Sequence, residues 1–413
     1  MNNITIILLN LRFGDFYSPT LFKLIKEMYP VRLVAILDQQ FKDRIGTHIL
    51  SYLDKIYSLQ AQTKAGFLAE FCFAQLCEII EYEKTKNNKI KIVCADEFNL
   101  VHAGHLRRKY HIPGHTDYDL LIFRDKTKMK KILQDAGLRV PRFRLLQETD
   151  NFASISASVG LPFVIKPVDS CGSFGVNVIK YPADYLSIAN TLKNTSVKFE
   201  VEEFIEGKLY HVDSCIYNNE LTFICANEYT CPNHDYNKGQ TLGSIPLDMM
   251  NSKAQSLITF ARKALAALGA NNVINHMEIF MTATQELVFL EVSARPPGAL
   301  VNFTHQINFG INLMDIDFFM QSGLHVELPV RIKNEKAFWA LFPLMPGKIR
   351  QFHIPNVRSR MDIQYFRELG SVILSEECQG IVGKVAQAIF YHHDPAILRE
   401  DFEYMRTFCL TEM

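Results

Sequence analysis

Short apolar runs alternate with stretches of helical spacing over the first 110 residues of the chain. Runs rich in β-branched residues predict strands over 4–9, 31–37 and 90–94, and apolar positions at helical spacing predict helices over 20–28 and 67–82. Strands that alternate with helices are typical of a parallel α/β sheet. No G-x-G-x-x-G motif follows the first strand, so nothing in this region indicates a dinucleotide site.

Beyond residue 120 the predicted strands lie closer together. Strands are expected over 163–167, 175–180, 198–205, 211–217, 273–281 and 286–293, and helices over 120–136, 184–192, 252–268 and 395–408. Residues 232–246 contain two prolines and two glycines and are expected to form a loop. The pattern predicts mixed α/β and α+β architecture without an internal repeat.

Composition and charge narrow the class of protein. The 413 residues carry 44 Lys+Arg and 44 Asp+Glu, so a basic field for nucleic acid is absent and no nucleic-acid partner is expected. No apolar run reaches the roughly 18–20 residues that cross a bilayer, and the first apolar run lacks the basic flank of a signal peptide. The nine cysteines are scattered without a C-x-x-C pair, which favours a reducing, cytoplasmic compartment.

The segment from Val273 to Arg295 contains a predicted pair of opposed carboxylates. A hairpin turn centred between Thr284 and Gln285 places Glu278 directly opposite Glu291. Like charges at that spacing destabilise a sheet unless a cation lies between them, and oxygen ligands of this kind suit Mg²⁺ with phosphate oxygens completing its shell. The alternative is a turn centred one residue away, with both glutamates in solvent and paired with Arg295.

A second candidate feature is Lys166, which ends a short apolar strand before the turn 169–175. A lysine beside a turn of small residues can hold phosphate oxygens, although an ordinary polar hairpin has the same pattern. The segment is not a G-x-x-x-x-G-K-[ST] loop. Cys171 lies in this turn with no histidine nearby in the sequence to activate it, so a role as nucleophile is not expected.

In order and spacing, these segments resemble the ATP-grasp family of ligases over roughly residues 90 to 300. The matching segments are F-R-D-K (123–126) with A-G-L-R-V-P (136–141), P-F-V-I-K-P (162–167), V-E-E-F-I-E-G (201–207), M-E-I (277–279) and E-V-S-A-R-P-P-G (291–298). Each is weak alone, but five in register are specific. Asp96-Glu97 and the R-P-P-G spelling resemble the branch of L-amino-acid (dipeptide) ligases and related biosynthetic amide ligases.

The resemblance implies a domain plan. An ATP-grasp fold would have an N-terminal α/β domain at 1–112 and a central part at 113–215, with a small mobile subdomain at about 145–205. A C-terminal lobe at 216–413 would carry the metal site and a C-terminal extension.

The resemblance also implies roles for individual residues. Lys126 and Lys166 would contact the phosphates of ATP, and the loop 169–176, which contains Ser173, would close over them. The adenine would face Glu202 and the backbone of Glu203 and Ile205, and the ribose would lie near His211 or Asp213. The metal ligands implied are Glu278, Glu291 and Ser293, where many members have Asn in place of the serine. Arg295 would stabilise the charge that develops during the reaction.

The reaction implied is an ADP-forming ligation that depends on ATP and Mg²⁺, with Mn²⁺ as an alternative metal. ATP converts a carboxylate to an acyl phosphate and an amine displaces the phosphate, so the partners are small carboxylate and amine substrates, with amino acids favoured. A homodimer is favoured by analogy with the family. The alternatives are a biotin-carboxylase-like or purine-pathway carboxylase or ligase, and a non-catalytic ATP-binding protein, against which the retained set of Lys166, Glu278, Glu291 and Arg295 argues.

Overall fold

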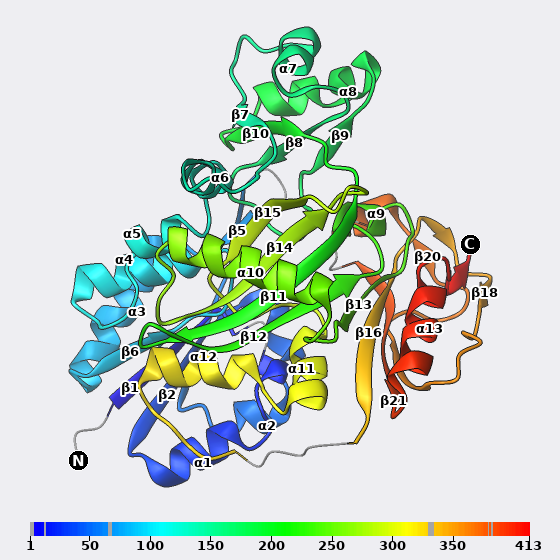
Figure 1. The fold of residues 1–413 in the computed structure, drawn as a ribbon. Coiled ribbons are helices and arrows are strands. Elements are labelled where there is room, and N and C mark those ends of the chain that lie inside the picture. The colour runs from blue at the N-terminus through cyan, green and yellow to red at the C-terminus, as the bar shows by residue number, and fades with distance from the viewer. Residues whose placement is uncertain (1–3, 12–13, 65–67, 329–333, 379, 381–382) are drawn as a thin grey trace.

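The computed structural model describes residues 4–11, 14–64, 68–328, 334–378, 380 and 383–413, and Figure 1 shows their arrangement. The N-terminal part is built on a four-stranded sheet in the order β3-β2-β1-β6, and all neighbours in it are parallel. Its strands are β1 (Ile4–Leu9), β2 (Val31–Asp38), β3 (Lys55–Leu59) and β6 (Ile90–Val93). The predicted parallel α/β sheet is therefore confirmed.

Helices cover both faces of this sheet, because alternate strand residues point to opposite sides. On one face Ile6 and Leu8 pack against helix α1, and on the other Ile7 and Leu9 pack against helices α3 and α4. The elements of this part are α1 (Leu21–Met28), α2 (Thr47–Leu50), α3 (Phe73–Lys86) and α4 (Leu100–Tyr110), the 3-10 turns Gly14–Phe16 and Gln39–Arg44, and the strand pair β4 (Gln62–Lys64) and β5 (Leu68–Glu70). The helix predicted over 67–82 is wrong at its start, where the chain forms β5; Phe67 itself lies outside the described residues.

A smaller antiparallel sheet stands apart at the top of Figure 1, in the order β7-β10-β8-β9. Its elements are β7 (Phe143–Leu145), β8 (Phe163–Pro167), β9 (Asn177–Ile179), β10 (Phe199–Glu203), α7 (Phe152–Val159) and α8 (Pro182–Lys193). It is joined to the N-terminal part by α5 (Asp117–Leu121) and α6 (Lys126–Asp135). The single helix predicted over 120–136 is wrong, because Asp125 caps the start of a separate helix by accepting from the backbone of Thr127 and Lys128.

The remaining residues form an eight-stranded sheet in the order β15-β14-β11-β12-β13-β16-β21-β19. Its strands are β11 (Lys208–Tyr217), β12 (Glu220–Tyr229), β13 (Leu242–Pro246), β14 (Val273–Met281), β15 (Leu287–Ser293), β16 (Lys336–Pro343), β19 (Arg360–Tyr365) and β21 (Lys384–His392). The accompanying elements are α9 (Asn233–Tyr236), α10 (Ser252–Ala267), α11 (Val301–Phe309), α12 (Leu313–Ser322), α13 (Pro395–Met405), the 3-10 turn Ser375–Glu377, and the pairs β17 (Gly347–Lys348) with β20 (Val372–Ile373) and β18 (Gln351–Phe352) with β22 (Thr411–Glu412). The loop predicted over 232–246 is wrong, because it contains α9 and β13.

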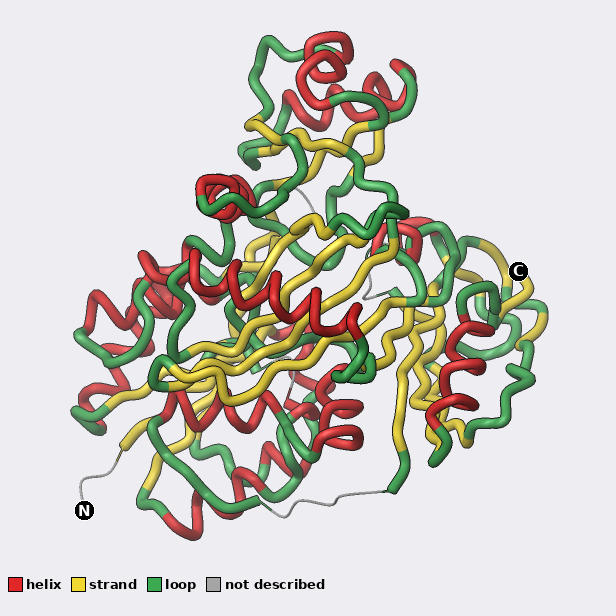
Figure 2. The backbone as a smooth tube through the Cα atoms, viewed as in Figure 1, coloured by secondary structure: helices red, strands yellow, loops and turns green. Residues whose placement is uncertain are grey.

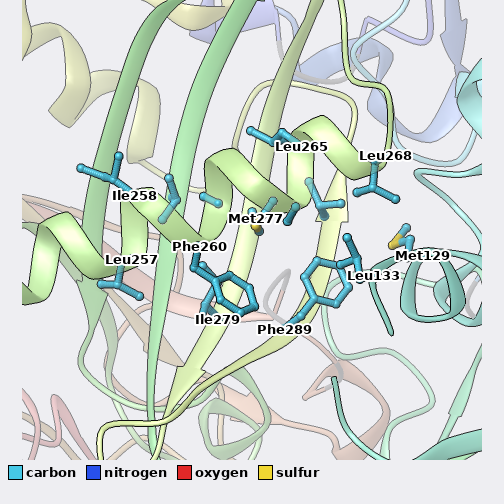
Figure 3. Packing of buried hydrophobic residues seen from close by; sticks show 14 of the residues in the cluster. Met129, Leu133, Leu257, Ile258, Phe260, Leu265, Leu268, Met277, Ile279 and Phe289 are labelled. Carbon is cyan, nitrogen blue, oxygen red and sulfur yellow. The ribbon is translucent and has the colours of Figure 1, made fainter. Parts of the chain in front are cut away.

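Alternation along β14 divides the large sheet into an apolar and a polar face. Met277 and Ile279 pack with Phe289 against Leu257 and Phe260 of α10, as Figure 3 shows. The neighbouring side chains of His276 and Glu278 point to the other face, where α11 and α12 lie (Figure 2). The hydrophobic core on one side thus fixes which face of β14 presents polar groups.

Candidate active site

A cavity lies where the three parts of the chain meet, and all three contribute to its walls. Its empty volume is about 1580 Å³, open solvent at the mouth included. Ten of the twelve site residues expected from the sequence line it: Lys126, Lys166, Ser173, Glu202, Glu203, Ile205, Glu278, Glu291, Ser293 and Arg295. We call its two charged sides the lysine wall and the carboxylate wall. The lysine wall comprises Lys126, Lys166 and Glu202, together with Lys130 and Glu200, which are buried and pair with them without lining the cavity. The carboxylate wall comprises Asn233, His276, Glu278, Glu291, Ser293 and Arg295.

The lysine wall is a buried group of charges that neutralise one another. The Nζ atom of Lys166 lies 2.6 Å from Glu202 Oε1, and the Nζ atom of Lys130 lies 2.8 Å from Glu200 and 2.5 Å from Glu202. Burial acts to lower the pKa of Lys166, but the facing glutamates outweigh it and raise that pKa above its ordinary value. Lys166 is therefore a fixed cation on the cavity wall.

Glu202 has both carboxylate oxygens occupied by lysines in this structure, Oε1 by Lys166 and Oε2 by Lys130. Glu203, which also lines the cavity, accepts from Arg139 and from the backbone and side chain of Arg142. The carboxylate of Glu202 thus holds the lysines in place, and its expected contact with an adenine would compete with these ion pairs.

The hairpin that carries Glu278 and Glu291 has the predicted register at these residues but a different turn. Glu278 pairs with Glu291, as predicted, while Met281 pairs with Leu287, which centres the turn on Thr284. A β-bulge between these pairs accounts for both, because Leu290 is an extra residue opposite the step from Glu278 to Ile279. Bulges re-aim side chains beside functional sites, and this one returns Glu291 to the cavity face.

The carboxylate wall offers oxygen atoms to a cation. Asn233 Nδ2 donates to Glu278 Oε1 at 2.7 Å, and Lys126 Nζ lies 3.2 Å from Glu291 Oε2. Burial acts to raise the pKa of Glu278, but His276 and Asn233 outweigh it and lower that pKa, which keeps the carboxylate ionised. The Oγ atom of Ser293 is buried and has no hydrogen-bond partner among the described residues. Two opposed carboxylates and an unpartnered hydroxyl fit a hard divalent cation such as Mg²⁺.

Arg295 is tied to the N-terminal part of the chain through Glu97. The Arg295 side chain donates to one oxygen of Glu97, and Arg124 donates to the other. The two arginines outweigh the effect of burial and lower the pKa of Glu97 to about 2. In the sequence, Glu97 and Arg124 stand out only as parts of matching segments, because the contacts that bring Arg295 and Arg124 together on Glu97 join residues 198 and 27 positions apart.

His211 and Asp213 lie in a buried polar cluster and do not line the cavity. Asp213 accepts from three imidazoles, those of His211 (2.9 Å), His276 (2.6 Å) and His305 (2.8 Å). Three imidazoles beside the carboxylate outweigh burial and hold the pKa of Asp213 well below its usual range. Their hydrogen bonds satisfy one another, so this structure does not support the expected position of His211 and Asp213 beside a ribose.

The loop after β8 lies against α6. Lys126 donates to the backbone oxygen of Ser170, and Arg124 donates to that of Asp169. Ser173 has a left-handed backbone with φ of 61° and lines the cavity. Burial raises the pKa of the Cys171 thiol to about 11, which keeps it protonated near neutral pH.

Residues that the sequence analysis missed come from the segment between β12 and β13 and from β16. Asn233, His234 and the single tryptophan, Trp339, line the cavity. The Oδ1 atom of Asn233 and the Nδ1 atom of His234 are buried without a hydrogen-bond partner among the described residues. The prolines and glycines of this segment predicted a loop, and no motif marked these residues as part of a site.

The described part of the chain contains no helix that is both long and apolar enough to cross a membrane.

Comparisons with known proteins agree on the domain. Residues 159–302 match the family model described as ATP-grasp domain. The L-arginine-specific L-amino acid ligase of Bacillus subtilis is 23% identical over 63% of this chain and 64% of its own length. A D-alanine--D-alanine ligase of Neisseria meningitidis is 28% identical over 42% of this chain and 57% of its own length. The match thus spans less than two thirds of either relative.

A solved structure extends the likeness in fold to nearly the whole chain. The L-amino acid ligase from Bacillus licheniformis superposes with a TM-score of 0.71 at 16% identity and covers 97% of both chains. The chain therefore contains an ATP-grasp domain and has the ATP-grasp fold.

Proposed function

We propose that this protein is an ATP- and Mg²⁺-dependent carboxylate–amine ligase that joins amino acids or amino-acid-like substrates. The observation that carries the proposal is the register of β14 and β15, which holds Glu278 opposite Glu291 in a cavity that also receives Lys126, Lys166 and Arg295. Paired carboxylates supply the ligands that Mg²⁺ prefers, and the three cations supply charge for phosphate oxygens. The names of the relatives, amino-acid ligases among them, support the substrate class.

Under this proposal the two walls bind different parts of the ATP–metal complex. Lys166 and Lys126 hold the phosphates of ATP, and Glu278, Glu291 and Ser293 hold the metal. Mg²⁺ held there would supply positive charge to the phosphate oxygens while the γ-phosphoryl group passes to a substrate carboxylate. The carboxylate oxygen forms a bond to phosphorus and the bond to ADP breaks, which gives an acyl phosphate.

Arg295 acts in the second step. The amine attacks the acyl carbon, negative charge develops on the acyl oxygen, and the guanidinium stabilises it. Glu97 fixes the orientation of that guanidinium, since it accepts from the Arg295 side chain on the cavity wall. Inorganic phosphate leaves as the amide forms, and no protein nucleophile takes part.

The unpartnered polar atoms of the cavity wall favour the binding of a polar ligand. Asn233 Oδ1, His234 Nδ1 and Ser293 Oγ are buried without partners among the described residues. A buried polar atom without a hydrogen bond costs about 1–3 kcal/mol, so a bound ligand that meets these atoms recovers that free energy.

The test is phosphate release from ATP and Mg²⁺ across a matrix of L-amino-acid pairs, with mass spectrometry of each active mixture. We expect release that requires two amino acids and yields their condensation product, and the loss of that release in Glu291→Gln. Phosphate release that requires bicarbonate and biotin, or ATP binding without release in every mixture, would contradict the proposal.

A further inference from the structure

The segment between β12 and β13, residues 230–241, reaches over the cavity and contacts the carboxylate wall. Asn233 Nδ2 donates to Glu278 Oε1 at 2.7 Å. Two further groups face the same oxygen, Tyr229 Oη at 3.5 Å and His276 Nε2 at 3.6 Å. All these contacts fall on one oxygen of Glu278, and Oε2 takes part in none of the hydrogen bonds found among the described residues.

This asymmetry limits how Glu278 can bind a cation. An oxygen that already accepts from an amide has less electron density to offer a metal, and rotation of the carboxylate would break the 2.7 Å bond. A carboxylate held in this way favours contact with a cation through its other oxygen. Hydrogen-bond partners of metal ligands commonly set both orientation and affinity.

We propose that Asn233 is a positioning residue that makes Glu278 a one-oxygen ligand and thereby sets the affinity of the site for its divalent cation. The inference rests on the proposed function, because it requires a cation between Glu278 and Glu291. It extends that function by assigning metal affinity to a segment that lies outside the expected ligands Glu278, Glu291 and Ser293.

The C-terminal residues hold this segment in place. Tyr236 Oη donates to the backbone oxygen of Gly383 at 2.9 Å, and Thr241 Oγ1 donates to that of Phe408 at 2.6 Å. Arg406 Nη1 donates to the backbone oxygen of Tyr229 at 3.0 Å. The C-terminal extension therefore supports the metal site through the segment 230–241, although it lies outside the matched domain.

The test measures the binding of ADP by calorimetry, without substrates, in the absence of divalent cation and with Mg²⁺ or Mn²⁺. The variants are Asn233→Ala and Asn233→Ser, neither of which can reach Glu278 with an amide. Asn237→Ala is the matched control, because Asn237 is exposed and directly follows the same short helix.

We expect Mg²⁺ to tighten ADP binding in the wild-type chain and in Asn237→Ala. In both Asn233 variants this tightening should fall by about 10–100-fold, while the affinity for ADP without metal stays within about twofold. The unchanged metal-free affinity also shows that the variants are folded.

Wild-type metal dependence in the Asn233 variants would overturn the inference and leave the proposed function standing. Loss of ADP binding without metal in these variants would also overturn it, since Asn233 would then support the fold rather than the metal ligand. Failure of the wild-type chain to bind ADP under any condition would contradict both the inference and the proposed function.

Discussion

The two walls of the cavity hold their charges in different ways. In the lysine wall, Lys130 and Lys166 are paired with Glu200 and Glu202 at 2.5 to 2.8 Å, so these two lysines have counterions without a ligand. In the carboxylate wall, Glu278 has one oxygen tied by Asn233, and its neighbour Ser293 has a buried hydroxyl without a partner among the described residues.

This difference explains how one cavity is both stable and able to bind a ligand. Buried charges are costly unless paired, so the lysine wall carries its own counterions and its cations stay in place. The carboxylate wall is left with unmet hydrogen-bonding capacity, which a metal and substrate can satisfy. One ion pair, Lys126 with Glu291 at 3.2 Å, joins the walls and must yield or rearrange when phosphate enters.

The largest effect is expected when Lys130, which pairs with both Glu200 and Glu202, is replaced. Lys130→Met leaves Glu200 and Glu202 with one lysine fewer in a fully buried site, and we expect the free energy of unfolding to fall by about 3–5 kcal/mol. Urea denaturation measures the loss. Lys131→Met is the control, since Lys131 and its partner Asp135 are more than half exposed, and it should change stability by less than about 1 kcal/mol. Equal losses in both variants would refute the idea of a self-neutralised wall.

A change in the carboxylate wall should affect turnover. Arg295→Lys keeps a positive charge but loses the planar group that Glu97 orients, so ligation should fall by about 10²–10³-fold. Steady-state phosphate release measures this, and Arg360→Lys, at a half-exposed position on β19, should retain the wild-type rate. Retention of activity by Arg295→Lys would show that charge alone suffices.

The contact between Glu97 and Arg295, which joins the N-terminal part to the carboxylate wall, should make the free energy of unfolding depend on pH. The pKa of Glu97 is lowered from 4.5 to about 2, so its ionisation contributes stability above pH 4.5 that is lost as pH falls toward 2. The full contribution is about 3 kcal/mol at neutral pH. The free energy of unfolding between pH 6 and 3 should therefore fall less in Glu97→Gln than in the wild-type chain. Parallel pH profiles of the two proteins would contradict a stabilising contact of ionised Glu97 with the arginines.

The smallest effect is expected in the loop beside the lysine wall. Cys171→Ala should leave phosphate release within about twofold of wild type, because a thiol with a pKa of about 11 is protonated and supplies no nucleophile. A loss greater than tenfold would give Cys171 a part in the chemistry that the proposed mechanism lacks.

Local patterns predicted the parts of this molecule that depend on neighbours in sequence. The strands β1, β2 and β8 follow from apolar runs, and the opposition of Glu278 and Glu291 follows from one hairpin. The predicted pairing of Glu278 with Glu291 is right because two differences cancel. The turn lies half a residue from its expected centre, and the bulge at Leu290 restores the register. A bulge leaves no mark in the alternation of so short a strand.

The contacts that could not be predicted join residues far apart in the chain. Asn233 reaches Glu278 across 45 residues, and Glu97 reaches Arg295 across 198. Lys130 is one of several lysines on α6, and nothing in the local pattern distinguishes it; its burial goes with its ion pairs to Glu200 and Glu202 of β10. Tertiary packing thus decides which polar residues of an ordinary helix or loop belong to the site.

The most direct test of acyl-phosphate formation follows oxygen from the acid to the phosphate. The amino acid that supplies the carboxyl group is labelled with ¹⁸O in its carboxylate, and the inorganic phosphate released with ATP and Mg²⁺ is analysed by mass spectrometry. We expect one ¹⁸O atom in each phosphate formed, because the carboxylate oxygen leaves with phosphorus when the amine attacks. Phosphate without the label would contradict activation of the acid as an acyl phosphate between the two walls.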